Sequence, residues 1–361
     1  MTDLTNFLRR RIALDGPISI ADYMNNALGH PEFGYYIRQD PFGVNGDFIT
    51  APEISQMFGE LIGLWCASTW DQMEKPKETK LVELGPGRGT MMSDALRAIR
   101  SNTEFRDAID VHLIETNKIL KARQSEILGE YQIDWHENLE GLSDGPAIFL
   151  ANEFFDALPI HQLVRRNGAW HERMVSYADV GFEFVLEKSP SRLSELLSQN
   201  LRNDVPEESI VEISPASIAV ANTIGRHIQK FDGAALIIDY GYLSPHPKDT
   251  LQAVQHHKHV HVLDEPGCAD ITAHVDFSSI ARAVHGFAKI HGPVDQGEWL
   301  KRLGITHRRD KLTAAANEHK MHEIELAYRR LTDSDQMGTL FKVIAITRTN
   351  APAPAGFEGG Q

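Results

Sequence analysis

Hydrophobic and polar residues follow two different periods along this chain. In its central part, short apolar runs typical of buried strands alternate with stretches in which apolar side chains recur at helical spacing. This alternation predicts a parallel, doubly wound α/β sheet with helices on both faces, whose ligands bind at the carboxyl ends of the strands. The apolar runs are KLVELG, DVHLIET, QIDWHENL, PAIFLANEF and GAALIIDYGY.

The pattern changes on both sides of this central part. Two helices near residues 2–15 and 19–28 lead into an irregular segment rich in glycine and aromatic residues, and an amphipathic helix follows from Pro52. Asn167-Gly168 lies between two alternating runs, the strongest short signal of a β-hairpin, and predicts an antiparallel insertion. A late apolar run, FKVIAITR, predicts a final strand.

These changes divide the chain into predicted segments. A core of two stretches is interrupted by the hairpin insertion and by an irregular, histidine-rich insertion, and the Pro/Gly-rich tail is expected to be disordered. The segments are 1–75 for the N-terminal helices and loop, 76–160 and 205–348 for the core, 161–204 for the hairpin, 243–278 for the irregular insertion and 349–361 for the tail.

Composition and charge narrow the class of protein. The 361 residues are 42% hydrophobic and 24% charged, as in ordinary soluble globular proteins. A net charge of −14 argues against general nucleic-acid binding, which needs a basic face. The two cysteines form no disulfide framework, and no apolar run approaches the roughly 18 residues of a membrane span. We therefore expect no membrane insertion, and a location in the cytoplasm or, for a mature organelle protein, in the mitochondrial matrix.

A glycine-rich turn follows the first apolar run, in LVELGPGRGT. Gly85, Gly87 and Gly89 connect the predicted strand to a helix, where the backbone can bend sharply or let a ligand approach closely. Their spacing, G-x-G-x-G, differs from the dinucleotide fingerprint G-x-G-x-x-G. A tight turn without any ligand is the alternative.

Two carboxylates accompany this turn. Glu115, at the end of the next predicted strand, is placed to accept hydrogen bonds from a ribose diol, although a solvated carboxylate would look the same. Glu83 lies inside the strand before the turn, where a carboxylate needs partners such as amides or a cationic ligand. This position favours a cofactor that bears positive charge over a pyrophosphate.

A third group of polar residues follows the run PAIFLANEF. Asn152, Glu153 and Asp156 fall at the same predicted edge of the sheet, where two carboxylates could bind a planar guanidinium bidentately or act as general acid and base. The alternative is the start of a helix, with Asn152 as its N-cap.

The histidines give a weaker signal. His256, His257, His259 and His261 resemble a metal cluster, but no carboxylate or cysteine completes it at a suitable spacing, so we expect no metal site. His274 is either a proton acceptor or a structural histidine. The chain contains no G-x-S-x-G elbow and no Walker lysine, which disfavours hydrolase and phosphotransferase functions.

Taken together, these stretches resemble the MidA-like family of S-adenosylmethionine-dependent methyltransferases, which includes mitochondrial complex I assembly factors. The resemblance extends from about residue 17 to 348 and is far more specific than a glycine motif alone. The matching stretches are FGYY, GDFITAPEISQMFGELIG, LVELGPGRGTMMSD, ANEFFDALPIHQ, ALIIDYGY, DITAHVDF and MGTLFKVI.

The resemblance implies a Rossmann-like, seven-stranded methyltransferase sheet whose last strand, FKVIAITR, is antiparallel, together with an N-terminal helical region and an antiparallel β insertion. It implies that the three glycines approach the methionine part of S-adenosylmethionine and that Glu115 holds the ribose. The GDFITAPE segment would cover the cofactor. Asn138 and Leu139 would border the adenine, and Asp47 and Thr50 would make polar contacts from the covering segment. Glu83 and Asn152 complete the set of expected cofactor-binding residues.

The activity attributed to the mitochondrial family member is symmetric dimethylation of an arginine in a core complex I subunit. By analogy of position with protein arginine methyltransferases, Glu153 and then Asp156 would orient the acceptor arginine, with His274 as a third catalytic candidate. Three alternatives stay open: an assembly chaperone that binds S-adenosylmethionine without much catalysis, a methyltransferase with a small-molecule acceptor, and a nicotinamide oxidoreductase, which the glycine spacing disfavours.

Overall fold

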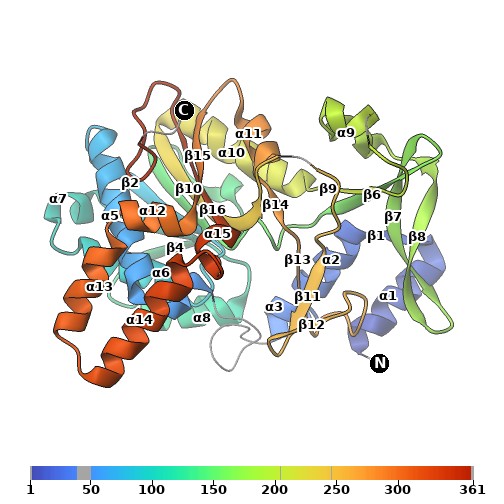
Figure 1. The fold of residues 1–361 in the computed structure, drawn as a ribbon, viewed down its shortest axis with the longest axis horizontal. Coiled ribbons are helices and arrows are strands. Elements are labelled where there is room, and N and C mark those ends of the chain that lie inside the picture. Colours follow the sequence, from blue (N-terminus) through green and yellow to red (C-terminus); the bar gives the residue numbers. More distant parts are fainter. Residues whose placement is uncertain (1, 39–49, 204, 245, 359–361) are drawn as a thin grey trace. The chain divides into compact units, whose positions relative to one another are not determined.

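The computed structural model describes residues 2–38, 50–203, 205–244 and 246–358. The chain forms two compact units, each assembled from stretches that are distant in the sequence (Figure 1). Unit 1 comprises residues 1–48, 156–219 and 242–278, and unit 2 comprises residues 49–155, 220–241 and 279–361. The predicted segments divide the chain more finely than these units, and their boundaries stay a prediction.

Unit 2 is built around one sheet. Its strands follow the order β15-β16-β10-β5-β2-β3-β4. From β10 to β4 all neighbours are parallel, whereas β16 is antiparallel to both β10 and β15. The predicted α/β sheet and its antiparallel last strand are therefore confirmed. The strands are β2 (Thr79–Leu84), β3 (Ile109–Ile114), β4 (Ile133–His136), β5 (Ala147–Asn152), β10 (Gly233–Tyr242), β15 (Lys289–Asp295) and β16 (Phe341–Thr347).

Helices connect these strands, as the alternating pattern predicts. Two of them, α10 and α11, begin in residues of unit 1 and continue in unit 2. Within the described residues, no helix is long and apolar enough to cross a membrane. The helices are α4 (Ala51–Ile54), α5 (Gln56–Gln72), α6 (Thr90–Ile99), α7 (Thr103–Ala108), α8 (Lys118–Ile127), η1 (Leu139–Gly141), α10 (Pro215–Phe231), α11 (Phe277–Val284), α12 (Gln296–Arg302), α13 (Ile305–Ala314), α14 (Glu318–Thr332) and α15 (Met337–Leu340).

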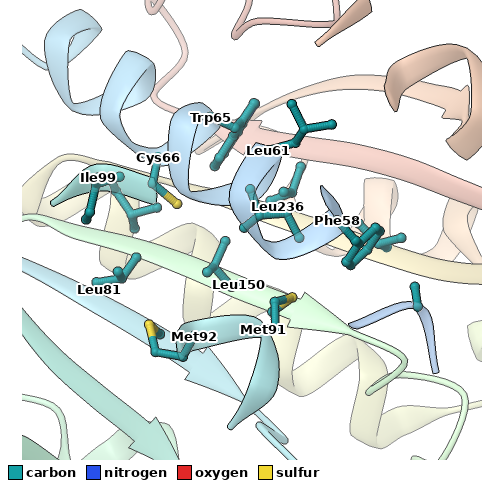
Figure 2. Close-up of a cluster of buried hydrophobic side chains, with 14 of the residues drawn as sticks. Phe58, Leu61, Trp65, Cys66, Leu81, Met91, Met92, Ile99, Leu150 and Leu236 are labelled. Atoms are coloured by element: carbon teal, nitrogen blue, oxygen red, sulfur yellow. The ribbon is translucent and has the colours of Figure 1, made fainter. Parts of the chain in front are cut away.

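The amphipathic helix predicted from Pro52 is α5, and it supplies much of the core of unit 2. Its apolar face, which includes Phe58, Leu61 and Trp65, packs in one buried cluster with side chains of the sheet such as Leu81 and Leu150 (Figure 2). Burial of large apolar side chains of this kind stabilises a fold by about 1.5–3 kcal/mol each. The apolar face of α5 and one face of the sheet therefore share a single hydrophobic core.

Two glycines set how closely α5 approaches α6. A Cβ atom on Gly59 would lie 2.6 Å from the Cβ of Asp94, and one on Gly63 would lie 2.4 Å from the carbonyl oxygen of Ala95. Both distances are too short for real contacts, so only glycine permits this spacing of the two helices. Because α6 begins directly after the glycine-rich turn, the contact also fixes the position of that turn.

Unit 1 contains a five-stranded antiparallel sheet. Its strands pair in the order β1-β7-β6-β9, with β8 on β7, and every pairing is antiparallel. Asn167 and Gly168 have φ values of 54° and 75°, as the predicted hairpin turn requires. The elements are β1 (Ile18–Ser19), β6 (His161–Arg166), β7 (Ala169–Ala178), β8 (Gly181–Pro190), β9 (Ile210–Ile213), η2 (Arg192–Leu196) and α9 (Gln199–Asn203).

The N-terminal helices of unit 1 appear as predicted, but the histidine-rich region is more regular than expected. A small antiparallel sheet in the order β12-β11-β13 forms there, so the prediction of an irregular insertion is wrong for these residues. His256 and His257 have positive φ and form the turn between β11 and β12. The elements are α1 (Asp3–Asp15), α2 (Ile20–Gly29), α3 (Tyr35–Arg38), β11 (Gln252–Gln255), β12 (Lys258–Val260), β13 (Asp270–Thr272) and β14 (Val275–Asp276).

The prediction of a disordered tail is wrong as far as Glu358. Phe357 is buried in the core of unit 2, where its ring lies 6.4 Å from that of Trp299. The tail contains only one large apolar side chain, but Ala353 and Ala355 also pack against the same core. Gly356 makes the approach possible, because a Cβ there would lie 2.6 Å from the Trp299 ring.

We predict that Gly63→Ala destabilises the protein. The added methyl group would meet the backbone of α6, and overpacking of this kind typically costs about 1–3 kcal/mol, which exceeds the roughly 1 kcal/mol that alanine gains in helix propensity. The control is Gly29→Ala, at an exposed helical glycine where an added Cβ would have no atom within 4 Å. Thermal unfolding should show a lower midpoint for Gly63→Ala only; equal midpoints for the two variants would contradict the close contact.

Candidate functional site

The glycine-rich turn after β2 has the backbone that its sequence predicts. Gly85, Gly87 and Gly89 have φ values of 62°, 54° and 87°, in the left-handed region that favours glycine. A Cβ on Gly85 would also lie 2.9 Å from the ring of Phe154. The turn ends at Gly89, the N-cap of α6, so the first amides of that helix are at the turn.

The register of the sheet places the predicted cofactor residues along one edge. Leu84 pairs with Ile114 on β3 and with Ala151 on β5. The residues that follow, Glu115 and Asn152, therefore flank the start of the glycine turn. These are carboxyl ends of parallel strands, where open α/β sheets bind their ligands.

Glu115 is a buried carboxylate whose hydrogen bonds are largely satisfied. Its Oε1 accepts hydrogen bonds from the backbone N–H groups of Thr116 and Asn117 at 2.8 and 2.7 Å. Its Oε2 accepts a longer one, 3.3 Å, from Nε2 of Gln124. Burial raises the pKa of Glu115, and the backbone hydrogen bonds oppose this rise. Since each carboxylate oxygen can accept more than one hydrogen bond, the group can still receive ligand hydroxyls.

Glu83 is buried in a different way. Only 2% of the residue is exposed, and its Oε2 has no hydrogen-bond partner among the described residues. Burial raises the pKa of Glu83 to about 8. The Oδ1 of Asn152, on the neighbouring strand, is also buried without a partner within the part of the chain that the structure describes. A ligand with a donor or a positive charge would satisfy such atoms, as the sequence predicts for Glu83.

Glu153 lies at the end of β5 with φ at +49°, an uncommon conformation for a residue other than glycine. Its N–H donates to the carbonyl of Ile238 on the neighbouring strand, 2.9 Å away. Its Oε1 accepts hydrogen bonds from the N–H of Ala51 at 3.0 Å and from Nδ2 of Asn152 at 3.3 Å. The side chain therefore anchors the first residue of α4 to the edge of the sheet.

The segment predicted to cover the cofactor is anchored at a second point. Glu53 on α4 accepts a hydrogen bond of 2.6 Å from the hydroxyl of Thr90 and lies 3.5 Å from the guanidinium of Arg88. Thr50 is buried at the N-cap of α4, whereas Asp47 lies outside the described residues. Glu53 lies within the motif GDFITAPE, but no local signal in the sequence identifies its role, because its partners are distant in the sequence.

Asn138 and Leu139 follow β4, next to the end of β3. Ile114 pairs with His136, and the N–H of Glu115 donates to the carbonyl of His136 at 3.0 Å. Asn138 is exposed and caps η1 by accepting a hydrogen bond from the N–H of Glu140, while Leu139 is half-buried. The pair is thus at the same edge of the sheet as Glu115.

Asp156 and His274 belong to unit 1. The N–H of Ala273 donates to the carbonyl of Asp156 at 3.0 Å, so the two predicted residues are in adjacent segments. The N–H of His274 donates to the hydroxyl of Thr250 at 2.9 Å. The pKa of His274 is lowered by burial and, to a lesser extent, by Lys248 and His246.

Gln124 also lies at this edge, although the sequence motifs did not predict it. It is fully buried on α8 and contacts the glycine turn, Glu115 and Trp135 through hydrogen bonds. The signal that could have found it is its spacing, because Leu120, Gln124 and Leu128 recur every four residues and put a polar group on an apolar helix face.

Comparisons with known proteins agree with this geometry. Residues 61–294 match a family model described as a putative S-adenosyl-L-methionine-dependent methyltransferase. The chain is 37% identical to the mitochondrial protein arginine methyltransferase NDUFAF7 homolog of Drosophila melanogaster, over 95% of this chain and 84% of that protein. It is 34% identical to the mitochondrial protein arginine methyltransferase NDUFAF7 of Xenopus laevis, over 98% and 89% of the two chains.

A solved structure is similar over nearly the whole chain. It is the crystal structure of a "likely methyl transferase" from Burkholderia thailandensis bound to S-adenosyl-homocysteine, with a TM-score of 0.85, 29% sequence identity and coverage of 99% of this chain and 95% of that one. The prediction of a cytoplasmic location is not supported, since the two relatives named above are mitochondrial proteins; their names agree with the predicted alternative, the mitochondrial matrix.

We predict that Glu83 makes stability depend on pH. In the unfolded chain its pKa is near the ordinary 4.5, and in the folded protein it is about 8, so between these values the folded state binds more protons. The stability that Glu83 contributes is therefore complete below pH 4.5 and is lost as the pH rises through 8. Glu83→Gln removes the titrating group. The difference in thermal unfolding midpoint, variant minus wild type, should therefore increase from pH 5 to pH 9.

Thermal unfolding of the ligand-free proteins measures this difference. Other titrating groups cancel in the comparison, because both proteins contain them. A difference between variant and wild type that stays constant from pH 5 to pH 9 would contradict the raised pKa of Glu83.

Proposed function

The chain belongs to the MidA-like family of S-adenosyl-L-methionine-dependent methyltransferases, and we propose that its methyl acceptor is an arginine side chain of a protein partner. The methyltransferase class and its methyl donor follow from the family. The observation that carries the proposed acceptor is the similarity, over 95% of the chain or more, to relatives named protein arginine methyltransferases.

The edge of the sheet in unit 2 fits the methyl donor. Two buried polar atoms there, Oε2 of Glu83 and Oδ1 of Asn152, have no partner among the described residues, and a ligand with an ammonium and hydroxyl groups could satisfy them. We assign the glycine turn to the methionine part and Glu115 to the ribose. Asn138 and Leu139 are assigned to the adenine, and Thr50 with Asp47 to the covering segment.

When bound, S-adenosylmethionine supplies an activated methyl group on a sulfonium, which a guanidinium nitrogen can attack. The protein's own contribution is mainly orientation, which can lower a barrier by up to about 7–11 kcal/mol. We assign Glu153 the role of orienting the guanidinium, since a carboxylate matches the planar fork of arginine. The same role for Asp156, and that of proton acceptor for His274, are further predictions.

The finer assignments follow from the resemblance to the mitochondrial relatives. We propose a core subunit of respiratory complex I as the protein substrate and the mitochondrial matrix as the location of the reaction in organisms that have mitochondria. We also propose that the strands from β15 to β4 correspond to the seven strands of the family's sheet. The acceptor is tested directly by incubating the protein with radiolabelled S-adenosylmethionine and cell extract, and then identifying the methylated residue by mass spectrometry.

We predict that Glu153→Gln abolishes methylation but preserves cofactor binding. The Gln side chain keeps an oxygen that can accept the hydrogen bond from Ala51, but it loses the charge that would hold a guanidinium. The methylation rate should fall roughly 100-fold or more, as expected for a misplaced acceptor, while the Kd for S-adenosylhomocysteine changes little. Calorimetry and a methyl-transfer assay measure the two quantities.

Two further variants separate the roles of Glu153. Ala51→Pro removes the N–H that donates to Glu153, at the first position of α4, where proline is tolerated, and it leaves the charge of Glu153 intact, so it should weaken cofactor binding. Glu323→Gln, an exposed carboxylate on α14, serves as the matched control. Equal losses of cofactor affinity and methylation in Glu153→Gln would contradict a role in orienting the acceptor.

A further inference from the structure

Gln124 is a fully buried polar residue on the inner face of α8. Its neighbours on that face are the apolar side chains of Leu120 and Leu128, which are also buried. A glutamine amide without partners would be costly in such a place. The packing also brings α8 against the glycine turn, since a Cβ on Gly89 would lie 3.4 Å from Cγ of Gln124 and 3.5 Å from Cδ1 of Leu128.

Three hydrogen bonds satisfy the amide of Gln124. Its Nε2 donates to the carbonyl of Gly87 at 2.7 Å and to Oε2 of Glu115 at 3.3 Å, and its Oε1 accepts from the indole N–H of Trp135 at 2.8 Å. The chemistry of the partners fixes the orientation of the amide, because an indole N–H only donates, whereas a carbonyl and a carboxylate accept. Neither a carboxylate nor an apolar side chain at this position could make all three bonds.

These bonds connect the two parts of the proposed cofactor site. Gly87 is the middle glycine of the turn, and Glu115 is the carboxylate at the end of the adjacent strand. Trp135 on β4 holds the acceptor end of the same amide, so the third strand of this edge takes part. Through one side chain, the turn, the carboxylate and β4 are held at fixed separations.

We propose that Gln124 is a positioning residue for cofactor binding, which holds the Gly87 carbonyl and the Glu115 carboxylate in the arrangement that receives S-adenosylmethionine. The inference rests on the proposed assignment of the turn and Glu115 to that cofactor. Gln124 acts through these groups and has no role in contacting the acceptor. Its loss should therefore reduce affinity for the cofactor more than it reduces the rate at saturating cofactor.

The test is the Kd for S-adenosylhomocysteine, measured by calorimetry on the full chain. Gln124→Leu leaves the indole N–H and the Gly87 carbonyl without their partner, and we expect the Kd to rise roughly tenfold or more, by analogy with the loss of groups that orient metal ligands. The matched control is Gln296→Leu. Gln296 is equally buried in unit 2 and donates one hydrogen bond to the carbonyl of Leu331, so its loss should lower the unfolding midpoint and leave the Kd within about twofold.

A double-mutant cycle distinguishes positioning from a general loss of stability. If Gln124 acts through Glu115 and the turn, Gln124→Leu and Glu115→Gln together should raise the Kd by less than the product of their separate effects. If Gln124→Leu does not fold, Trp135→Phe removes a single hydrogen bond to the same amide and should raise the Kd by a smaller factor.

An unchanged Kd in folded Gln124→Leu, or in Trp135→Phe where Gln124→Leu does not fold, would overturn the proposal. The proposal would also be overturned if the double variant raised the Kd by the full product of the two separate effects. Failure of the wild-type protein to bind S-adenosylhomocysteine would instead contradict the cofactor site itself, and that result is visible before any variant is made.

Discussion

The close contact between α5 and α6 is the constraint on which unit 2 depends. Gly59 and Gly63 let the two helices approach until a methyl group would no longer fit, and α5 at the same time covers the sheet with Phe58, Leu61 and Trp65. This contact fixes the position of the start of α6, which follows the glycine-rich turn. A site whose loop must match a ligand to within fractions of an ångström needs a support of this rigidity.

The two buried carboxylates of the site differ in how the cost of their burial is reduced. Glu115 receives backbone and side-chain donors, which oppose the rise of its pKa that burial causes. Glu83 has a pKa near 8 and a partnerless oxygen in the described part of the chain, so it is largely protonated at neutral pH until a cation reaches it. This difference favours a nucleoside that carries a positive charge, which a pyrophosphate-containing dinucleotide would not provide there.

The sequence predicted those features whose cause is local. Three glycines directly after an apolar run predict a turn, and Glu115 directly after the second apolar run marks the end of a strand. Both predictions depend only on neighbouring residues. Glu53 was not recognised, because its partner Thr90 is far away in the sequence and only the fold brings it near. Gln124 showed a local signal in its helical spacing, but its bond to the carbonyl of Gly87 is visible only in the fold. The ordered tail was missed for a related reason: Phe357 is the one large apolar residue in a stretch of Pro, Gly and Ala, and it packs against Trp299, which is distant in the sequence.

The place of β16 in the sheet has a consequence for biosynthesis. This strand is the last along the sequence of unit 2, yet it lies between β15 and β10, one position in from the edge of the hydrogen-bonded order. On the ribosome, the pairing of β16 with β10 and with β15 cannot form until residues 341–347 have left the exit tunnel. Unit 1, whose residues end at 278, can be complete while β16 is still to be made. The nascent sheet therefore exposes one edge of the apolar strand β10 late in translation, which is the stage at which a chaperone would protect it.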